Sequence, residues 1–475
     1  MVPATNFSGP NAPVAIAVLP FDWEAVGSQR RHYAWAIQEL LTQQFSENAR
    51  LLVRSRGTVA RAMMEVGANA DSAARLMRVR HFITGRITSV RGSQGIEVAL
   101  MTVGRRDTTW RARFSSEWTL HRMVAAINRG ALRAARIPES GGARNRPLPE
   151  TAVLEAVVEG DYYLLSNTLA GADSARAAYE AVQPRAPSWA PLLARLARSY
   201  VLVLERGGKV PRMDDAAALA RAQSLADQGV KADSTIGETW TARAVVARYR
   251  DPVRFQGALE AHARAVRVAP RDADAEYEYG MTLMRLGDDR SAELHLRRSL
   301  AIEPNRAPTL TALAELALRD RRWAESCGLS NASIAVWPYD PIAYATRARA
   351  RLWLSQERDA YADVETAARF TAEPWVSALH VLVDVRVGDV AAARGNAQGL
   401  AARWLAPGRM HSVRNATYLA MAFAGIADRR RAVEVLRRAN PLGPDFVTAM
   451  REPALASIRS DTVIRRLVRQ ASGQH

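Results

Sequence analysis

The chain has 475 residues, of which 48% are hydrophobic, and its formal net charge is +17 at pH 7. About three domains are expected at this length, and no run of about 18 apolar residues is available to cross a membrane. Cys327 is the only cysteine, which excludes disulfide frameworks and thiolate metal sites.

The positive charge comes almost entirely from arginine, since Lys209 and Lys231 are the only lysines. The arginines are spread along helix-like segments and interleaved with Asp and Glu. This mixed pattern is typical of a solvated helix surface. Association with nucleic acid is the alternative that the net charge alone would support.

Residues 1–12 are rich in Pro, Asn, Gly and Ser, which predicts a disordered N-terminus. They lack the basic and apolar regions of a signal peptide. The expected location is therefore cytoplasmic by default, or extracytoplasmic if the chain is a fragment of a longer membrane protein.

Residues 13–137 have the pattern of a small α/β domain. Short β-branched and apolar runs predict strands over 14–21, 51–53, 81–90, 95–103 and 108–114. Amphipathic spacing predicts helices over 31–46, 58–66, 71–78 and 120–135. The turn cluster at 91–95 indicates a hairpin, and Asn69 or Asp71 is expected to cap the third helix.

A Pro/Gly-rich linker is expected over 138–150, and helical repeats over 151–470. Pro270, Pro304 and Pro338 each end a helix-like segment and lie 34 residues apart. A 34-residue period is the length signature of the tetratricopeptide repeat (TPR), a helix–turn–helix unit that stacks into a superhelix. We count seven to eight helix pairs, clearest over 239–370.

The small residues that let two antiparallel helices approach recur in phase with this period. In two consecutive units they are Gly280, Ala292 and Ser299, then Ala314, Ser326 and Ser333. The fold class is therefore α+β overall, a small N-terminal α/β domain followed by an all-α TPR superhelical solenoid.

Several motifs resemble those of one bacterial family. Residues 14–21 (VAIAVLPF) resemble the "IAVLPF" opening of TolB-amino-terminal-like domains, and 51–56 (LLVRSR) resemble the "LRVVSR" strand. Residues 73–87 resemble the "GRELGVDYVLEGSV" segment. Residues 451–461 (REPALASIRSD) resemble the "DPxFxPLRSDPRF" ending of the associated TPR proteins.

In that family these two domains usually form the C-terminal half of longer chains, whose other half is a kinase, a nucleotide cyclase or a winged-helix domain. None of those partner domains is expected here. The resemblance implies a sensory or scaffolding module, and it supplies no catalytic residue for these positions.

Catalytic and cofactor motifs are missing from the sequence. There is no G-x-x-x-x-G-K-[ST], G-x-S-x-G, H-E-x-x-H or G-x-G-x-x-G segment. His262 and His295 fall at equivalent repeat positions, where a packing role is favoured over a metal pair because no further ligand has the right spacing. Cys327 is expected to be a half-buried small residue rather than a redox thiol. We therefore expect no enzyme activity, no metal and no cofactor.

The first helices of the repeats should line the concave face of a TPR superhelix and bind partner polypeptides there. The repeat positions predict a partner-binding set consisting of Arg248, Tyr249, Tyr277, Met281, Met284, Arg285, Arg319, Arg349 and Trp353. Arginine, aromatic and Met side chains suit peptide capture, with acidic or C-terminal segments as the expected ligands. The alternative is that these are ordinary solvated helix positions. The asparagine of the TPR carboxylate clamp is replaced by Val245, Met281, Glu315 and Arg349.

The sequence thus predicts a non-enzymatic protein–protein interaction scaffold or sensor of bacterial signalling or envelope assembly. A nucleic-acid-associated or transcription-regulatory accessory protein is the alternative.

Overall fold

The computed structural model describes residues 13–22, 31–46, 48, 50–67, 69–90, 93–105, 107–115, 118, 120–139, 149–164, 169–206, 208–251, 255–405, 412–439 and 444–472. The predicted disordered segment 1–12 and most of the predicted linker 138–150 lie outside these residues. The chain divides into two compact units, which we describe separately. The first comprises Met1–Val246, Arg264–Ala273 and Leu300–Asn305, and the second comprises Ala247–Ala263, Asp274–Ser299 and Arg306–His475.

The first unit begins with a five-stranded mixed sheet of order β2-β1-β3-β4-β5. Its strands are β1 (Val14–Val18), β2 (Leu51–Val53), β3 (His81–Val90), β4 (Ser93–Thr102) and β5 (Thr108–Ser115). Strand β1 pairs in parallel with β2 and β3, while β4 pairs antiparallel with β3 and β5. The predicted first strand is too long, because regular pairing ends at Val18 and only an isolated bridge at Asp22 follows.

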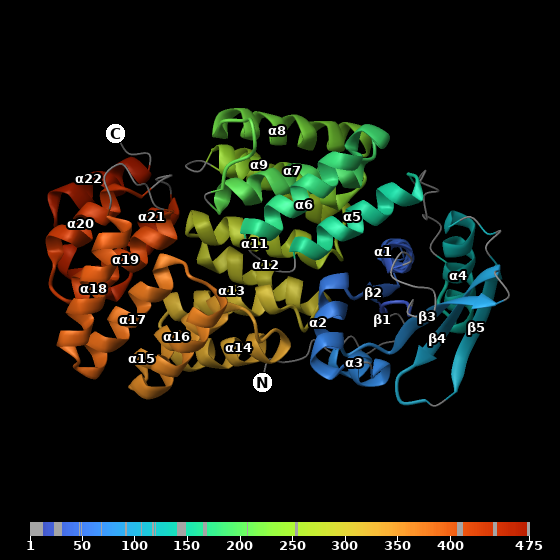
Figure 1. Cartoon of the computed structure of the whole chain (residues 1–475), viewed down its shortest axis with the longest axis horizontal. Coiled ribbons are helices and arrows are strands. Elements are labelled where there is room, and N and C mark those ends of the chain that lie inside the picture. Colours follow the sequence, from blue (N-terminus) through green and yellow to red (C-terminus); the bar gives the residue numbers. More distant parts are fainter. Residues whose placement is uncertain are drawn as a thin grey trace. The chain divides into compact units, whose positions relative to one another are not determined.

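Helices cover both faces of this sheet (Figure 1). On one face, α1 (Arg31–Ser46) and α4 (Leu120–Ala134) pack on the sheet around Ile37, Ile83 and Ile127. On the other face, α2 (Arg56–Val66) and α3 (Ala70–Leu76) pack around Ala17 and Phe82. Side chains of successive β1 residues thus pack into the cores on opposite faces of the sheet, as expected for a strand buried on both faces.

The helix predictions in this region are confirmed within two residues at each end. The side chain of Asn69, one of the two expected caps, accepts a hydrogen bond from the backbone N–H of Ser72 at 2.9 Å. This bond satisfies one of the donors that the first turn of α3 leaves unpaired.

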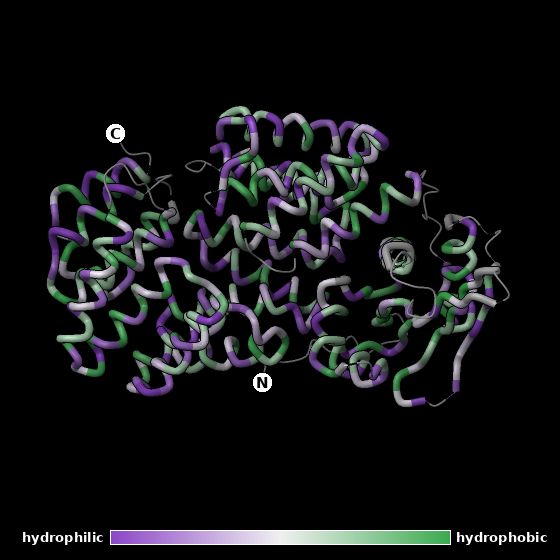
Figure 2. Tube along the Cα trace, viewed as in Figure 1, coloured by the Kyte–Doolittle hydropathy of each residue, from purple (hydrophilic) through white to green (hydrophobic). Residues whose placement is uncertain are grey.

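The rest of the described chain is helical and forms antiparallel pairs. Its helices are α5 (Thr151–Leu164), α6 (Leu169–Val182), α7 (Ala190–Glu205), α8 (Asp215–Ala232), α9 (Gly237–Arg250), α10 (Gln256–Val268), α11 (Ala273–Leu286), α12 (Asp289–Ile302), α13 (Ala307–Arg319), α14 (Trp323–Val336), α15 (Pro341–Trp353), α16 (Glu357–Phe370), α17 (Pro374–Val387), α18 (Val390–Trp404), α19 (Val413–Gly425) and α20 (Arg429–Arg437). Apolar and polar residues are interspersed along them (Figure 2). After α20 come α21 (Pro444–Ala449), the 3₁₀ helix η4 (Pro453–Ile458) and α22 (Thr462–Ala471).

The small repeat positions lie where the helices of a pair meet. Ala292, Ser299, Ala314, Ser326 and Ser333 are fully buried at 0% exposure. At Gly280 a Cβ atom would lie 2.8 Å from Cγ of Leu296, so no larger residue fits without a shift. The predicted TPR spacing is therefore confirmed at the helix interfaces themselves.

The tight turns inside the repeats use a left-handed backbone conformation at a recurring position. Gly287 has φ +86° and Gly388 has φ +85°, while Arg321, Ser355 and Ala427 hold φ between 56° and 65°. Positions 287, 321 and 355 are 34 residues apart. The repeat therefore imposes this conformation even where the residue is not glycine.

No described helix is both long and apolar enough to span a membrane.

Candidate partner-binding site on the first helices of the repeats

We call the first helix of each pair its A helix, and consider the A helices α11, α13, α15, α17 and α19 of the second unit. Arg285, Arg319 and Trp353 follow one another at the 34-residue period, and Arg386 follows 33 residues later. The period therefore places one residue from each of four successive A helices in a row near the helix C-termini.

Two arginines of this row hold neighbouring repeats together. Nη1 of Arg319 donates to the carbonyl of Met284 at 3.1 Å, and Nη2 of Arg386 donates to the carbonyl of Leu352 at 2.9 Å. Both acceptors lie in the last turn of an A helix, where carbonyls lack intrahelical partners and the helix dipole favours a cation. These arginines thus close the C-terminal ends of α11 and α15.

Trp353 is the apolar member of the row, and 43% of its surface is accessible. Its ring stacks on Trp323 with a centroid distance of 5.3 Å and an interplanar angle of 13°. The guanidinium of Arg386 lies over the Trp353 ring at 5.5 Å. These contacts fix the orientation of a large apolar surface that solvent can reach.

Beside this stack lies a cavity of about 180 Å³. Its lining includes Trp323 and Trp353 together with three arginines and three carboxylates, namely Arg319, Arg321, Arg451, Asp289, Asp320 and Glu452. Small-molecule sites usually have about 300–1,000 Å³. This cavity is smaller, and a group of its size would be a single side chain of a partner.

Arg349 is covered by the chain's own C-terminal segment. It forms an ion pair with Glu452, and its guanidinium lies 5.3 Å from the ring centre of Tyr418. Burial acts to lower the pKa of Arg349, but Glu452 and Tyr418 outweigh it and raise the pKa above its ordinary value. This guanidinium is therefore already engaged inside the molecule.

Other members of the predicted set also lie inside the packing. Arg248 is 4% exposed and pairs with Glu278 at 3.3 Å, and Met284 is 3% exposed. Tyr277 is half-buried under the guanidinium of Arg306, at 5.1 Å, and burial raises its pKa. The remaining members, Tyr249, Met281 and Arg285, are half-buried.

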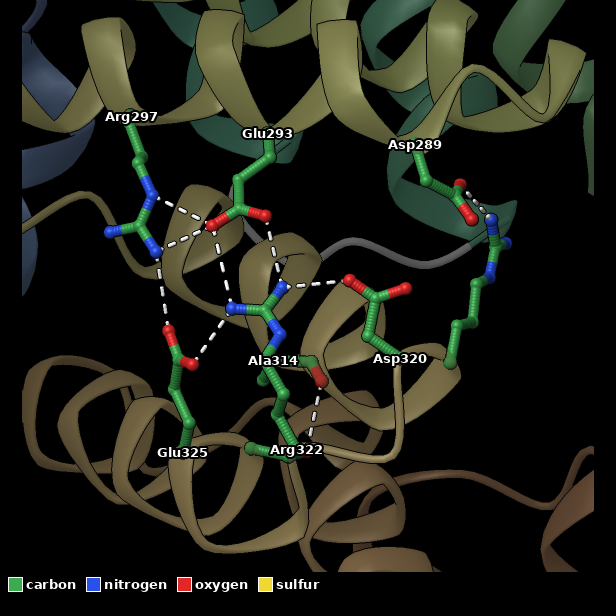
Figure 3. A network of polar contacts seen from close by, with 9 residues as sticks. Asp289, Glu293, Arg297, Ala314, Asp320, Arg322 and Glu325 are labelled. Carbon is green, nitrogen blue, oxygen red and sulfur yellow. Dashed lines mark hydrogen bonds and ion pairs between the residues drawn. The ribbon is translucent and has the colours of Figure 1, made fainter.

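A polar network ties α12 to α14 next to this row (Figure 3). Arg322 donates to Glu293 at 2.9 Å and to Glu325 at 2.7 Å, and Arg297 pairs with both of these carboxylates. Burial acts to raise the pKa of Glu293, but the two arginines outweigh it and lower the pKa. The network fixes α14, and so the position of Trp323.

The histidines at equivalent positions take packing roles, as expected. The ring of Tyr279 lies between His262 and His295, at centroid distances of 5.3 and 4.1 Å. His262 shares a hydrogen bond with Thr282, and His295 pairs with Glu276. Cys327 is half-buried, as predicted, and burial raises the pKa of its thiol. Within the described residues, no group of His, Cys, Asp and Glu has an arrangement suited to a metal ion.

The comparisons with known proteins agree with the repeat pattern. The middle TPR-like domain of cilia and flagella-associated protein 70 is the family whose model matches, over residues 247–439. No curated protein matches the chain in sequence.

Several solved structures are similar in part. PilF of Pseudomonas aeruginosa is 18% identical, over 48% of this chain and 94% of that chain, with a TM-score of 0.37. A thermophilic TPR protein of Thermus thermophilus is 22% identical, over 42% and 100%, with a TM-score of 0.36. A human IFIT1 dimer with PPP-AAAA is 14% identical, over 75% and 87%, with a TM-score of 0.42.

Proposed function

We propose that this chain is a non-enzymatic scaffold that binds a partner polypeptide on the A helices of its second unit, with Trp353 as the anchor. The observation that carries the proposal is the exposed Trp353 ring, in contact with Trp323 and Arg386 and beside a cavity of side-chain size. Aromatic residues with a fixed orientation at the rim of a small pocket are typical of binding hot spots.

The chemistry of the ligand follows from the arginines of the same face. Arg285 and Arg319 precede Trp353 in the same row, and we propose that they favour an acidic or C-terminal segment of the partner, although Arg319 also pairs with Asp289 at 3.1 Å. The resemblance of residues 13–137 to TolB-amino-terminal-like domains supports a role in bacterial signalling or envelope assembly.

The test is selection of peptide ligands from a random displayed library, followed by affinity measurement with the purified full chain. Trp353→Ala should weaken binding by at least about tenfold, because hot-spot truncations cost about 2 kcal/mol or more. Tyr361→Ala is the matched control, since Tyr361 is 44% exposed but lies on α16, the second helix of its pair. Equal affinities for Trp353→Ala and the unmodified chain would exclude this anchor.

Arg285→Glu tests the charge preference, because it should weaken acidic peptides more than neutral ones. Arg349→Glu is unsuitable for this purpose, since it would place a carboxylate beside Glu452. Binding that persists at about 0.5 M salt would separate peptide recognition from nucleic-acid association, which screening abolishes.

A further inference from the structure

A second hollow surface lies at the C-terminal end of the second unit, between α21, the segment after η4, α22 and the α13–α14 turn. Its volume is about 820 Å³. We call it the cap groove. Its lining consists of the arginines Arg321, Arg451, Arg459, Arg465 and Arg469 with the apolar residues Val447, Met450, Ile464 and Val468.

The charge of the cap groove is of one sign, since five arginines and no acidic residue line it. Arg459 is committed to the fold, because its guanidinium donates to the carbonyls of Met450, Arg451 and Glu452, each at 2.7 Å. The other four guanidinium groups are exposed, and within the described part of the chain none of them has a carboxylate within 4 Å. Neighbouring cations without counter-charges repel one another and attract an anionic ligand.

The floor of the groove is apolar and regularly spaced. Ile464 and Val468 lie one helical turn apart on α22, and Arg465 and Arg469 lie one turn apart on the adjacent stripe. Ile464 is 1% exposed and anchors α22 to the core, whereas Val468 is half-buried and faces the hollow. An apolar stripe thus runs beside a cationic stripe with the same spacing of one turn.

We propose that the cap groove binds an acidic amphipathic helix of a partner protein. The apolar face of that helix lies on Val468 and Met450, and carboxylates at i and i+4 face Arg465 and Arg469. This is the helix-in-groove mode of recognition, with the charges reversed relative to α22. Nucleic acid is disfavoured because no aromatic side chain for base stacking lines the groove. A bilayer surface is disfavoured because the apolar residues line a hollow instead of protruding.

This site goes beyond the A-helix site proposed above, and separate variants test the two. The probe is a synthetic peptide of about 14 residues, roughly 21 Å long as a helix, with Leu on one face and Glu on the other. A peptide of the same composition with its pattern scrambled, a Lys-for-Glu version, a single-stranded oligonucleotide and anionic vesicles complete the set. Affinity for the full chain and helix formation on binding, by circular dichroism, are the measurements.

The expected result is that the patterned acidic peptide binds at least about tenfold more tightly than the scrambled one and becomes helical. Arg465→Glu with Arg469→Glu should remove this preference. Arg430→Glu with Arg437→Glu, two exposed arginines of α20 outside the groove, makes the same charge change and should preserve it. Trp353→Ala should also leave it intact, which distinguishes failure of this proposal from failure of the A-helix site.

Arg465→Gln alone provides a milder second variant, should the double variant of α22 not fold, because Arg465 lines the cap groove and not the cavity beside Trp353. Equal binding of patterned and scrambled peptides would overturn the proposal. It would also be overturned by peptide binding that both α22 and α20 variants weaken equally, or by groove-dependent binding of only the oligonucleotide or the vesicles.

Discussion

The guanidinium of Arg349 in α15 donates to the hydroxyl of Tyr418 in α19 at 3.1 Å, although 69 residues separate them in the chain. The same guanidinium pairs with Glu452, which lies between α21 and η4. One side chain therefore connects two repeats and the C-terminal segment.

Removal of this guanidinium should destabilise the second unit. Arg349→Ala leaves the Glu452 carboxylate, 22% exposed, without its ion-pair partner, and breaking a largely buried pair in this way costs about 3 kcal/mol. Urea unfolding measures the loss. Arg358→Ala, an exposed position on α16, is the control and should change the free energy of unfolding by less than about 0.5 kcal/mol. A similarly small loss for Arg349→Ala would show that the contact contributes little.

The close approach of two helices at Gly280 predicts that an alanine there lowers the stability, whereas an alanine at Gly328, which has open space around it, raises it. Gly280→Ala places a methyl group 2.8 Å from Cγ of Leu296, which is fully buried and cannot swing aside. Overpacking of this kind costs about 1–3 kcal/mol. Gly328→Ala in α14 meets nothing within 4 Å, so it should gain up to about 1 kcal/mol from helix propensity. Thermal unfolding of both variants tests the spacing, and a stabilised Gly280→Ala protein would contradict it.

Most of the fold was predictable because it depends on local patterns. The helix over 31–46 and the strands over 51–53 and 81–90 have the predicted bounds, since their apolar residues recur with one clear period. The small repeat positions were predictable for the same reason. The left-handed turns at Arg321 and Ser355 carry no glycine signal, and only the 34-residue spacing from Gly287 would have indicated them.

The candidate site was less predictable because it depends on contacts between repeats. The repeat positions indicated that Arg319 and Trp353 belong to the A helices. They did not indicate whether the Arg319 guanidinium is free or bonded to the previous A helix, because both cases have the same period in the sequence. The position of Arg349 gave no sign of Glu452, 103 residues away. The cap groove lies after the helix pair α19–α20, where the 34-residue period gives no guide, although the spacing of apolar residues and arginines in α22 (VIRRLVR) is typical of an amphipathic helix.

The turn at Gly388 allows a direct measurement of how much the left-handed backbone conformation costs a residue other than glycine. Its φ is +85° and a Cβ atom there would meet nothing within 4 Å, so Gly388→Ala adds no clash. The cost, about 1–2 kcal/mol, comes from the left-handed conformation alone. Gly395→Ala in α18 also meets nothing but lies in a helix, so it should stabilise by up to about 1 kcal/mol. Denaturant midpoints that move in the same direction for both variants would rule out a conformational origin.

A cluster of carboxylates around one arginine in the first unit predicts a pH-dependent stability. Arg195 lies 2.8 Å from Glu39, 3.4 Å from Asp161 and 3.1 Å from Glu238. Burial raises the pKa of Glu238 to about 7. The negative charge of Asp161 adds to this shift, and the positive charge of Arg195 opposes it. Between pH 4.5 and 7 the folded protein holds a proton that the unfolded chain has lost. The free energy of unfolding from this group therefore falls as pH rises through that range.

Glu238→Gln removes this titration. The free energy of unfolding of the variant minus that of the unmodified chain should therefore rise between pH 5 and pH 8. The rise is at most about 3 kcal/mol, because each unit of pKa shift corresponds to about 1.4 kcal/mol. Chemical unfolding at the two pH values measures it. Glu65→Gln, an exposed position on α2 with no charged partner among the described residues, is the matched control, and its difference from the unmodified chain should stay constant. A Glu238→Gln difference that is equally constant would mean that the carboxylate ionises in the folded protein as readily as in the unfolded chain, with Arg195 alone compensating for its burial.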